Sequence, residues 1–164
     1  MKERAALDND TLDFIKRLPR KMHPLTQLST LLLYLSKDSK FTKAYHGGVN
    51  KRKLWEHGYE DTMDLLAKIG PAAAYVYRHT YHNDDFIKPD NSLDYGANLT
   101  QMLGFKGEAF TEAVRGYLSI HTDHEGGNVS AHATHLVGSA LSDPYLSYSA
   151  GLNGLAGPLH GLAA

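Results

Sequence analysis

Residues 24–35 read PLTQLSTLLLYL. Leucine recurs in this stretch at intervals of three and four residues, at Leu25, Leu28, Leu31, Leu32 and Leu35. That spacing places the leucines on one face of an α-helix. Pro24 suits the first turn, where a backbone N–H has no intrahelical partner. The stretch therefore predicts an amphipathic helix.

A second helical stripe follows, formed by Leu54, Tyr59, Met63, Leu66 and Ile69. We expect this helix to end at Gly70-Pro71, because glycine can take a left-handed turn there and proline cannot continue the helix. A separate helix is expected around Ala73–Thr80. The acids, proline and asparagines of Asn83–Asn91 then predict a surface loop.

The C-terminal half continues the helical pattern. A stripe at 109–118 runs into His121 and is expected to stop near Gly126-Gly127, and another covers 129–140. Ser142-Asp143-Pro144 predicts the start of a helix that ends near Leu152, because Ser or Asp can cap it and proline presets its first residue. The glycine-rich tail from Asn153 to Ala164 predicts irregular structure. With no convincing strand pair, the sequence predicts one all-α domain.

Composition excludes several classes of function. The 164 residues carry 17 basic and 18 acidic side chains, a formal charge of -1, so nothing draws the chain to nucleic acid. The longest apolar run, near Leu31–Leu35, is far shorter than the roughly 20 residues that span a bilayer. No targeting segment is visible at the start. Without cysteine, there is no disulfide, thiolate zinc site or cysteine nucleophile.

Ten histidines raise the question of a metal site, with four of them close together at His121, His124, His132 and His135. His121 and His124 are spaced one helical turn apart, but Asp123 and Glu125 complete neither the HExxH zinc motif nor its inverse. We therefore expect no metal. The alternative, a His-rich metal-binding protein, predicts stoichiometric zinc and loss of structure on chelation.

The remaining histidines differ in their surroundings. His132 and His135 lie among small and apolar residues and are expected to be packed. Solvated rings are expected at the five that lie among charged or turn residues, namely His23, His46, His57, His79 and His82. His124 stands where a helix gives way to glycines, a suitable place to bind a small anion. His160 lies in the glycine-flanked loop 157–161, which suits a side chain exposed to substrate.

Three motifs lie near the C-terminus: DHEGGNVSAH (123–132), SALSDPYLS (139–147) and NGLAGPLHGLA (153–163). In residues, order and spacing they closely resemble the citrate synthase family of the eukaryotic mitochondrial type. Upstream, RAAL (4–7), HPLTQL (23–28), WEHGYEDTMDLLAK (55–68) and NLTQMLG (98–104) also resemble it, whereas Asp84–Asn91 departs from it. The resemblance implies the all-helical citrate synthase fold, in a homodimer whose cleft lies between a large and a small domain. Residues 1–164 would be a large-domain segment that ends near the start of the small domain.

The resemblance also implies a reaction and roles for particular residues. The family condenses acetyl-CoA, a substrate rather than a cofactor, with oxaloacetate to give citrate and coenzyme A in the mitochondrial matrix. His160 would donate a hydrogen bond to the thioester oxygen, with Ser130 orienting its ring, although a helical serine can instead bond its own backbone. His124 would bind oxaloacetate, with Asn128 as its neighbour.

A basic segment would contact the coenzyme A phosphates across the dimer. Lys51 stands where the family usually has arginine, and Arg52 lies beside it. Lysine lacks the planar fork that grips phosphate in two places. The alternative for this segment is a solvated basic turn.

A different class of function stays open at this level. The chain can be a truncated relative that serves as a structural or interaction subunit. A native protein of 18.1 kDa would favour that alternative, and a long native chain would favour the enzyme.

We expect the 164-residue chain alone to make no citrate. The resemblance places the aspartate base, a further histidine and the arginines that hold oxaloacetate after its last residue. Incubating the purified chain with acetyl-CoA and oxaloacetate and assaying citrate tests this, and any citrate formed would refute it.

Overall fold

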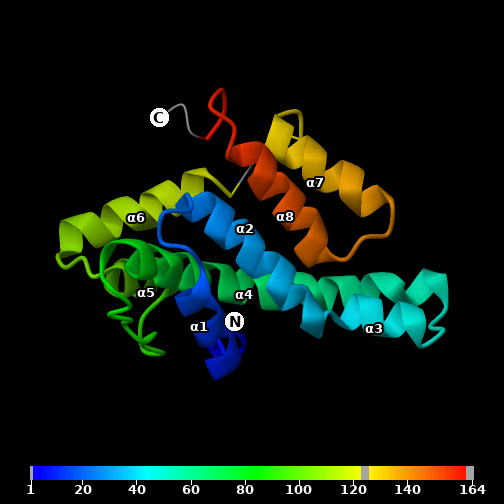
Figure 1. The fold of residues 1–164 in the computed structure, drawn as a ribbon, viewed down its shortest axis with the longest axis horizontal. Helices are drawn as coiled ribbons and strands as arrows, with labels where there is room; N and C mark the ends of the chain where they lie inside the picture. Colours follow the sequence, from blue (N-terminus) through cyan, green and yellow to red (C-terminus); the bar gives the residue numbers. More distant parts are fainter. Residues whose placement is uncertain (1, 123–125, 162–164) are drawn as a thin grey trace.

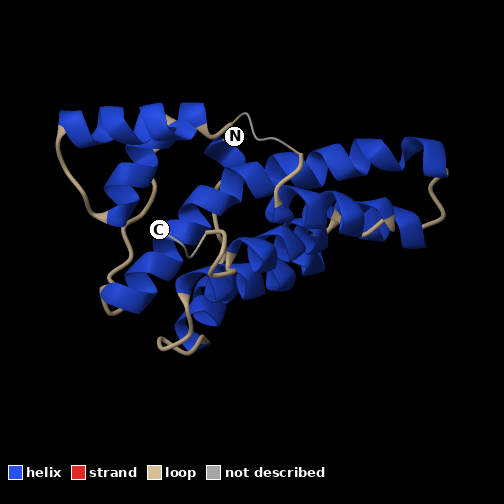
Figure 2. Cartoon of the chain, turned by 90° about the horizontal axis from the view of Figure 1, so that it is seen from above, coloured by secondary structure: helices blue, strands red, loops and turns tan. Residues whose placement is uncertain are grey.

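The computed structural model describes residues 2–122 and 126–161, and within these ranges the regular structure is helical, without strands (Figure 2). Eight α-helices are described, together with three short 3₁₀ turns at Lys2–Arg4, Ser36–Asp38 and Lys51–Lys53. The α-helices are α1 (Asn9–Arg17), α2 (Pro24–Leu35), α3 (Lys40–His46), α4 (Leu54–Tyr81), α5 (Tyr95–Leu103), α6 (Glu108–Ile120), α7 (Val129–Ser139) and α8 (Pro144–Leu155). The prediction of an all-α chain is confirmed.

Helix α4 is the longest element and runs through the length of the molecule (Figure 1). It contacts α3 near one end and α5 near the other, while α2 and α8 pack on its middle. Helix α7 packs on α8, and α6 packs on α5. The core between them is formed by Ile15, Leu31, Leu32, Leu35, Leu65, Ala72, Ala74, Tyr75, Val76, Met102 and Tyr145.

The expected helix end at Gly70-Pro71 is wrong, because α4 continues through both residues to Tyr81. Proline removes one hydrogen bond from a helix and costs about 3 kcal/mol or more. Here the buried stripe continues on both sides of Pro71, with Leu65 before it and Tyr75 and Val76 after it in the same core. Burial of a large apolar side chain contributes roughly 1.5–3 kcal/mol, so packing outweighs the lost bond.

Other boundaries follow the sequence more closely. Pro24 begins α2 and Asp143 caps α8, its carboxylate accepting from Leu146 N at 3.0 Å. Residues 82–94 form a connection without helix, as expected for the loop. Helix α6 ends at Ile120, earlier than expected, and α8 continues three residues past the expected Leu152.

The prediction that His79 is solvated is wrong. Its side chain is 1% exposed on the inner face of α4. Its Nε2 donates to the Leu18 carbonyl at 2.9 Å, and Nδ1 lies 2.6 Å from a carboxylate oxygen of Asp84. Burial opposes ionisation of Asp84, but hydrogen bonds from His79 and Arg20 outweigh it and lower the pKa of that carboxyl. His79 therefore joins the end of α1 to the loop after α4.

Helix α8 is fixed on α2 by buried hydroxyl groups. The two Oγ atoms of Ser29 and Ser149 lie 2.8 Å apart, and Ser149 Oγ lies 3.2 Å from the Ser29 carbonyl. Ser29 also donates to Asn153 Oδ1 at 2.7 Å. Small side chains at this crossing let the two helices approach while their polar atoms stay paired.

A buried carboxylate on α4 holds the start of α3. Asp61 is 0% exposed and accepts from Ser39 Oγ at 2.8 Å, Lys40 N at 2.8 Å and Phe41 N at 3.0 Å. Negative charge is favourable at a helix N-terminus, where backbone N–H groups lack intrahelical partners.

We predict that Asp61→Asn lowers the free energy of unfolding by about 3 kcal/mol, because the amide turns a donor toward buried donors and removes the charge. Urea denaturation measures it. The matched control is Glu56→Gln, an exposed carboxylate in the first turn of α4, which should lower stability by only about 0.3–1 kcal/mol. Equal effects of the two substitutions would contradict the role given to Asp61.

Candidate active site

The start of α7 carries the first half of the candidate site. Asn128 caps the helix, its Oδ1 accepting from Ala131 N at 2.9 Å. The same oxygen accepts from Ser130 Oγ at 2.8 Å. This is a common geometry for asparagine before a helix. Because Asn128 holds both the helix end and the Ser130 hydroxyl, it fixes the direction in which that hydroxyl points.

The turn after α8 carries the second half. His160 N donates to Gly157 O at 3.0 Å, and Gly161 N donates to Leu155 O at 2.9 Å, so the chain folds back onto the end of α8. A Cβ at position 161 would lie 2.5 Å from that Leu155 oxygen. Only glycine allows this turn. It brings the half-buried ring of His160 to α7, where Nε2 lies 3.0 Å from Ser130 Oγ.

The contact between Ser130 and His160 depends on a close approach of α7 and α8. A Cβ added at Gly151 of α8 would overlap Thr134 Oγ1 and lie 3.1 Å from the Ser130 carbonyl oxygen. Thr134 Oγ1 in turn donates to that oxygen at 2.8 Å. A groove runs along this contact, with Ser130, Thr134, His135 and Tyr148 among its lining residues.

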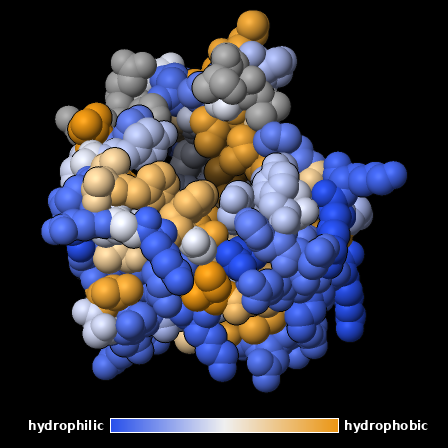
Figure 3. Space-filling view, turned by 90° about the vertical axis from the view of Figure 1, so that its left-hand side faces the viewer, coloured by the Kyte–Doolittle hydropathy of each residue, from blue (hydrophilic) through white to orange (hydrophobic). Residues whose placement is uncertain are grey.

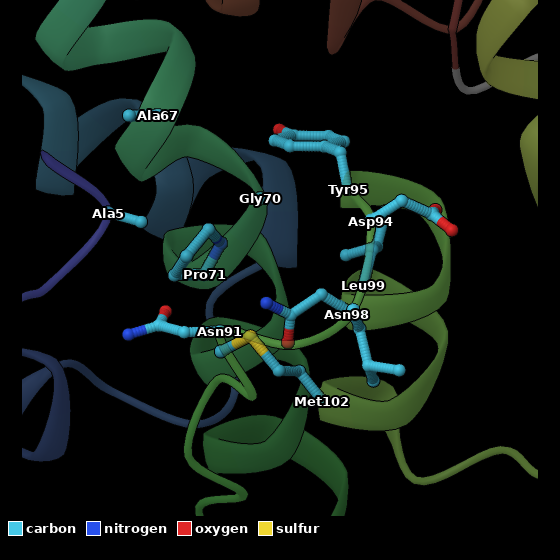
Figure 4. Close-up of a pocket in the computed structure, with 11 residues that line it drawn as sticks. Ala5, Ala67, Gly70, Pro71, Asn91, Asp94, Tyr95, Asn98, Leu99 and Met102 are labelled. Carbon is cyan, nitrogen blue, oxygen red and sulfur yellow. The ribbon is translucent and has the colours of Figure 1, made fainter. Parts of the chain in front are cut away.

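A more enclosed cavity lies elsewhere, between α4 and α5 (Figure 4). Its volume is about 120 Å³ and its wall is mainly apolar. The Asp94 carboxylate points away from it and pairs with Arg115, which together with the Ala97 backbone N–H lowers the pKa of Asp94 to about 2. Because the one acid of this cavity is engaged outside it, we place the site at Ser130 and His160.

Two other residues predicted for the site lie apart from this pair. Lys51 and Arg52 are exposed in the 3₁₀ turn that precedes α4, at the end of the molecule away from the loop that holds His160 (Figure 1). His124 lies outside the described residues. His121 is exposed, donates from Nδ1 to Tyr117 O at 2.7 Å and stacks on the Tyr117 ring.

The expected packing of His132 and His135 is wrong, because both are exposed on α7. In the described part of the chain α7 packs against α8, so one face is covered and the others are open. Val129 and Leu136 are also 62% and 64% exposed. Sequence pattern identified α7 as a helix but could not show how much of its surface is covered.

No group of three or more histidine or acidic side chains in residues 2–122 and 126–161 is arranged to hold a metal ion. Among the helices described, none is long and apolar enough to cross a membrane.

The described fold is all-helical, and in it a serine at a helix start lies within hydrogen-bonding distance of a histidine in a glycine-bounded turn. The chain belongs to the citrate synthase family: the sequence model described as "Citrate synthase, C-terminal domain" matches residues 1–164.

Relatives support the assignment. The chain is 59% identical over 161 residues to the mitochondrial citrate synthase of Tetrahymena thermophila, covering 98% of this chain and 35% of that protein. It thus spans about a third of that relative.

Solved structures share the fold. Citrate synthase from Pyrobaculum aerophilum superposes with a TM-score of 0.84 at 32% identity, over 98% of this chain and 40% of that one. That of Thermoplasma acidophilum, solved as a ternary complex with carboxymethyl coenzyme A and oxaloacetate, has a TM-score of 0.79 at 23% identity, over 98% of this chain and 40% of its own.

We predict that Gly151→Ala lowers the free energy of unfolding by about 1–3 kcal/mol, because the added methyl group forces α7 away from α8. Thermal or urea denaturation measures it. Gly116→Ala is the matched control: it lies within α6 and a Cβ there has nothing within 4 Å. Alanine there should stabilise by roughly 0.5–1 kcal/mol. Stabilisation by both substitutions would contradict the close approach.

Proposed function

We propose that the protein to which this chain belongs is a citrate synthase, which condenses acetyl-CoA with oxaloacetate and water to give citrate and coenzyme A. The observation that carries the proposal is the 3.0 Å contact of Ser130 with His160, two residues from separate family motifs that lie 30 positions apart. The mitochondrial names of the relatives favour the mitochondrial matrix as its location.

His160 is the residue we assign to the thioester. Removing a proton from the methyl group of acetyl-CoA leaves an enolate, and its negative charge develops on the thioester oxygen. A hydrogen-bond donor already aimed at that oxygen lowers the barrier, and it need not be charged. Ser130 holds one ring nitrogen, so the other is left to face substrate. Acetyl-CoA is consumed as substrate, and the reaction as proposed needs no cofactor.

The remaining roles come from the family resemblance. By that resemblance, His124 binds oxaloacetate and Asn128 belongs to the same subsite, while Lys51 and Arg52 contact coenzyme A phosphates from the partner subunit of a homodimer. The Thermoplasma acidophilum citrate synthase of the same fold was solved with carboxymethyl coenzyme A and oxaloacetate bound. Lys51 and Arg52 are exposed and distant from His160 within one chain, an arrangement compatible with a contact made across two subunits.

Apolar surface on the described chain is consistent with further subunit and domain contacts. Figure 3 shows apolar residues gathered around a hollow at the end of the molecule where α5 and α6 lie. On α6, Phe110, Tyr117 and Ile120 are 44%, 63% and 75% exposed. Patches of this kind commonly mark contacts with other protein surfaces. We propose that residues 1–164 are a segment of the large domain and that a partner subunit and the small domain complete the site.

We predict that His160→Gln in the full-length protein lowers kcat by about 10²–10³-fold, the usual effect of losing one donor to a developing oxyanion. Release of the coenzyme A thiol from acetyl-CoA in the presence of oxaloacetate measures it. His132→Gln, an exposed histidine of α7, is the control and should leave kcat within about twofold. Full activity of the His160 variant would remove the basis of the proposal.

A further inference from the structure

The Ser130 hydroxyl lies between two partners but has one proton to give. Asn128 Oδ1 is 2.8 Å from Ser130 Oγ, and His160 Nε2 is 3.0 Å from it. A hydroxyl donates one hydrogen bond and can accept two. The partner that receives the proton therefore decides whether His160 must donate to Ser130 or accept from it.

The cap of α7 indicates that Asn128 receives the Ser130 proton. Ala131 N lies 2.9 Å from Asn128 Oδ1, and a backbone N–H needs an acceptor, so the amide must turn its oxygen to this side. An amide oxygen only accepts. Ser130 can therefore bond to it only by donating its proton. The lone pairs of Ser130 Oγ are then left for His160, and Nε2 must carry a proton to make the second bond.

We propose that Asn128 is a positioning residue that sets the tautomer of His160 through Ser130. In the substrate-free protein, neutral His160 carries its proton on Nε2 and presents an unprotonated Nδ1 on the other side of the ring. Asn128 acts through Ser130, because its Oδ1 accepts the Ser130 proton. The catalytic meaning of this arrangement rests on the proposed function, although the tautomer itself does not.

The consequence for the proposed reaction is a step before chemistry. A neutral His160 can donate from Nδ1 to a thioester oxygen only after Ser130 turns its O–H from Asn128 to Nε2. In that change the Nε2 proton passes to water and a proton from water arrives at Nδ1, so the charge of the ring is the same before and after. The hydroxyl of Ser130 is thus a rotor with two settings, and Asn128 favours the resting one.

The test is the ¹⁵N NMR spectrum of the full-length protein labelled in its histidines, without substrate, in alkaline buffer where imidazole is neutral. Ring nitrogens with and without a proton have well-separated shifts, and the signals of His160 are those lost in His160→Gln. We expect a protonated Nε2 and an unprotonated Nδ1. A protonated Nδ1 in the unsubstituted protein would overturn the proposal, whatever the variants do.

Two substitutions at position 128 test whether Asn128 determines the tautomer of His160. Asn128→Gly removes the acceptor, and glycine is a tolerable helix cap. It should shift the ratio of the two tautomers toward Nδ1–H by about fivefold, the factor that one neutral hydrogen bond supplies. Asn128→Asp, the matched control, retains an oxygen that only accepts and should leave Nε2 protonated. An unchanged ratio in the glycine variant would refute the role of Asn128.

The NMR measurement distinguishes failure of the positioning role of Asn128 from failure of the proposed synthase function. A protein that makes citrate but carries the His160 proton on Nδ1 refutes the positioning role and leaves the proposed function standing. A protein with the expected tautomer and no synthase activity refutes the proposed function and leaves the positioning role standing.

Discussion

The site depends on the distance between α7 and α8. The two helices can lie as close as they do because Gly151 leaves room for Thr134 and for the carbonyl of Ser130. That spacing places the first turn of α7 beside the turn after α8, and Ser130 meets His160 there. A hydrogen bond between side chains weakens steeply with distance, so a shift of the helices by the width of a methyl group would abolish it.

The rest of the fold holds this pair of helices in place. Helix α8 lies on α2 through the buried hydroxyls of Ser29 and Ser149, and both helices rest on α4. Helix α4 remains continuous across Pro71 because buried core residues lie on the helix both before and after that proline. It also organises its own surroundings, capping α3 with Asp61 and joining α1 to the loop after α4 with His79. Polar side chains thus fix the relative positions of helices whose burial supplies most of the stability.

Local pattern in the sequence was a good guide to helices and their starts, and a poor guide to what covers them. Asp143-Pro144 begins α8 as predicted, because capping depends on residues that are neighbours in the chain. The end expected at Gly70-Pro71 did not occur, and His79 proved buried while His132 and His135 proved exposed. Each of these errors concerns burial, which is decided by segments distant in sequence.

The same division applies to the candidate site. By itself, the sequence determined the all-helical class, the citrate synthase family and the candidate residues His160, Ser130 and Asn128, because helical periodicity and motif order are written along the chain. Only the tertiary structure decided that these three side chains join in one hydrogen-bonded series while Lys51 and Arg52 lie apart from them. The physical reason is that Ser130 and His160, 30 positions apart in the chain, are brought within hydrogen-bonding distance only by the packing of α8 on α7.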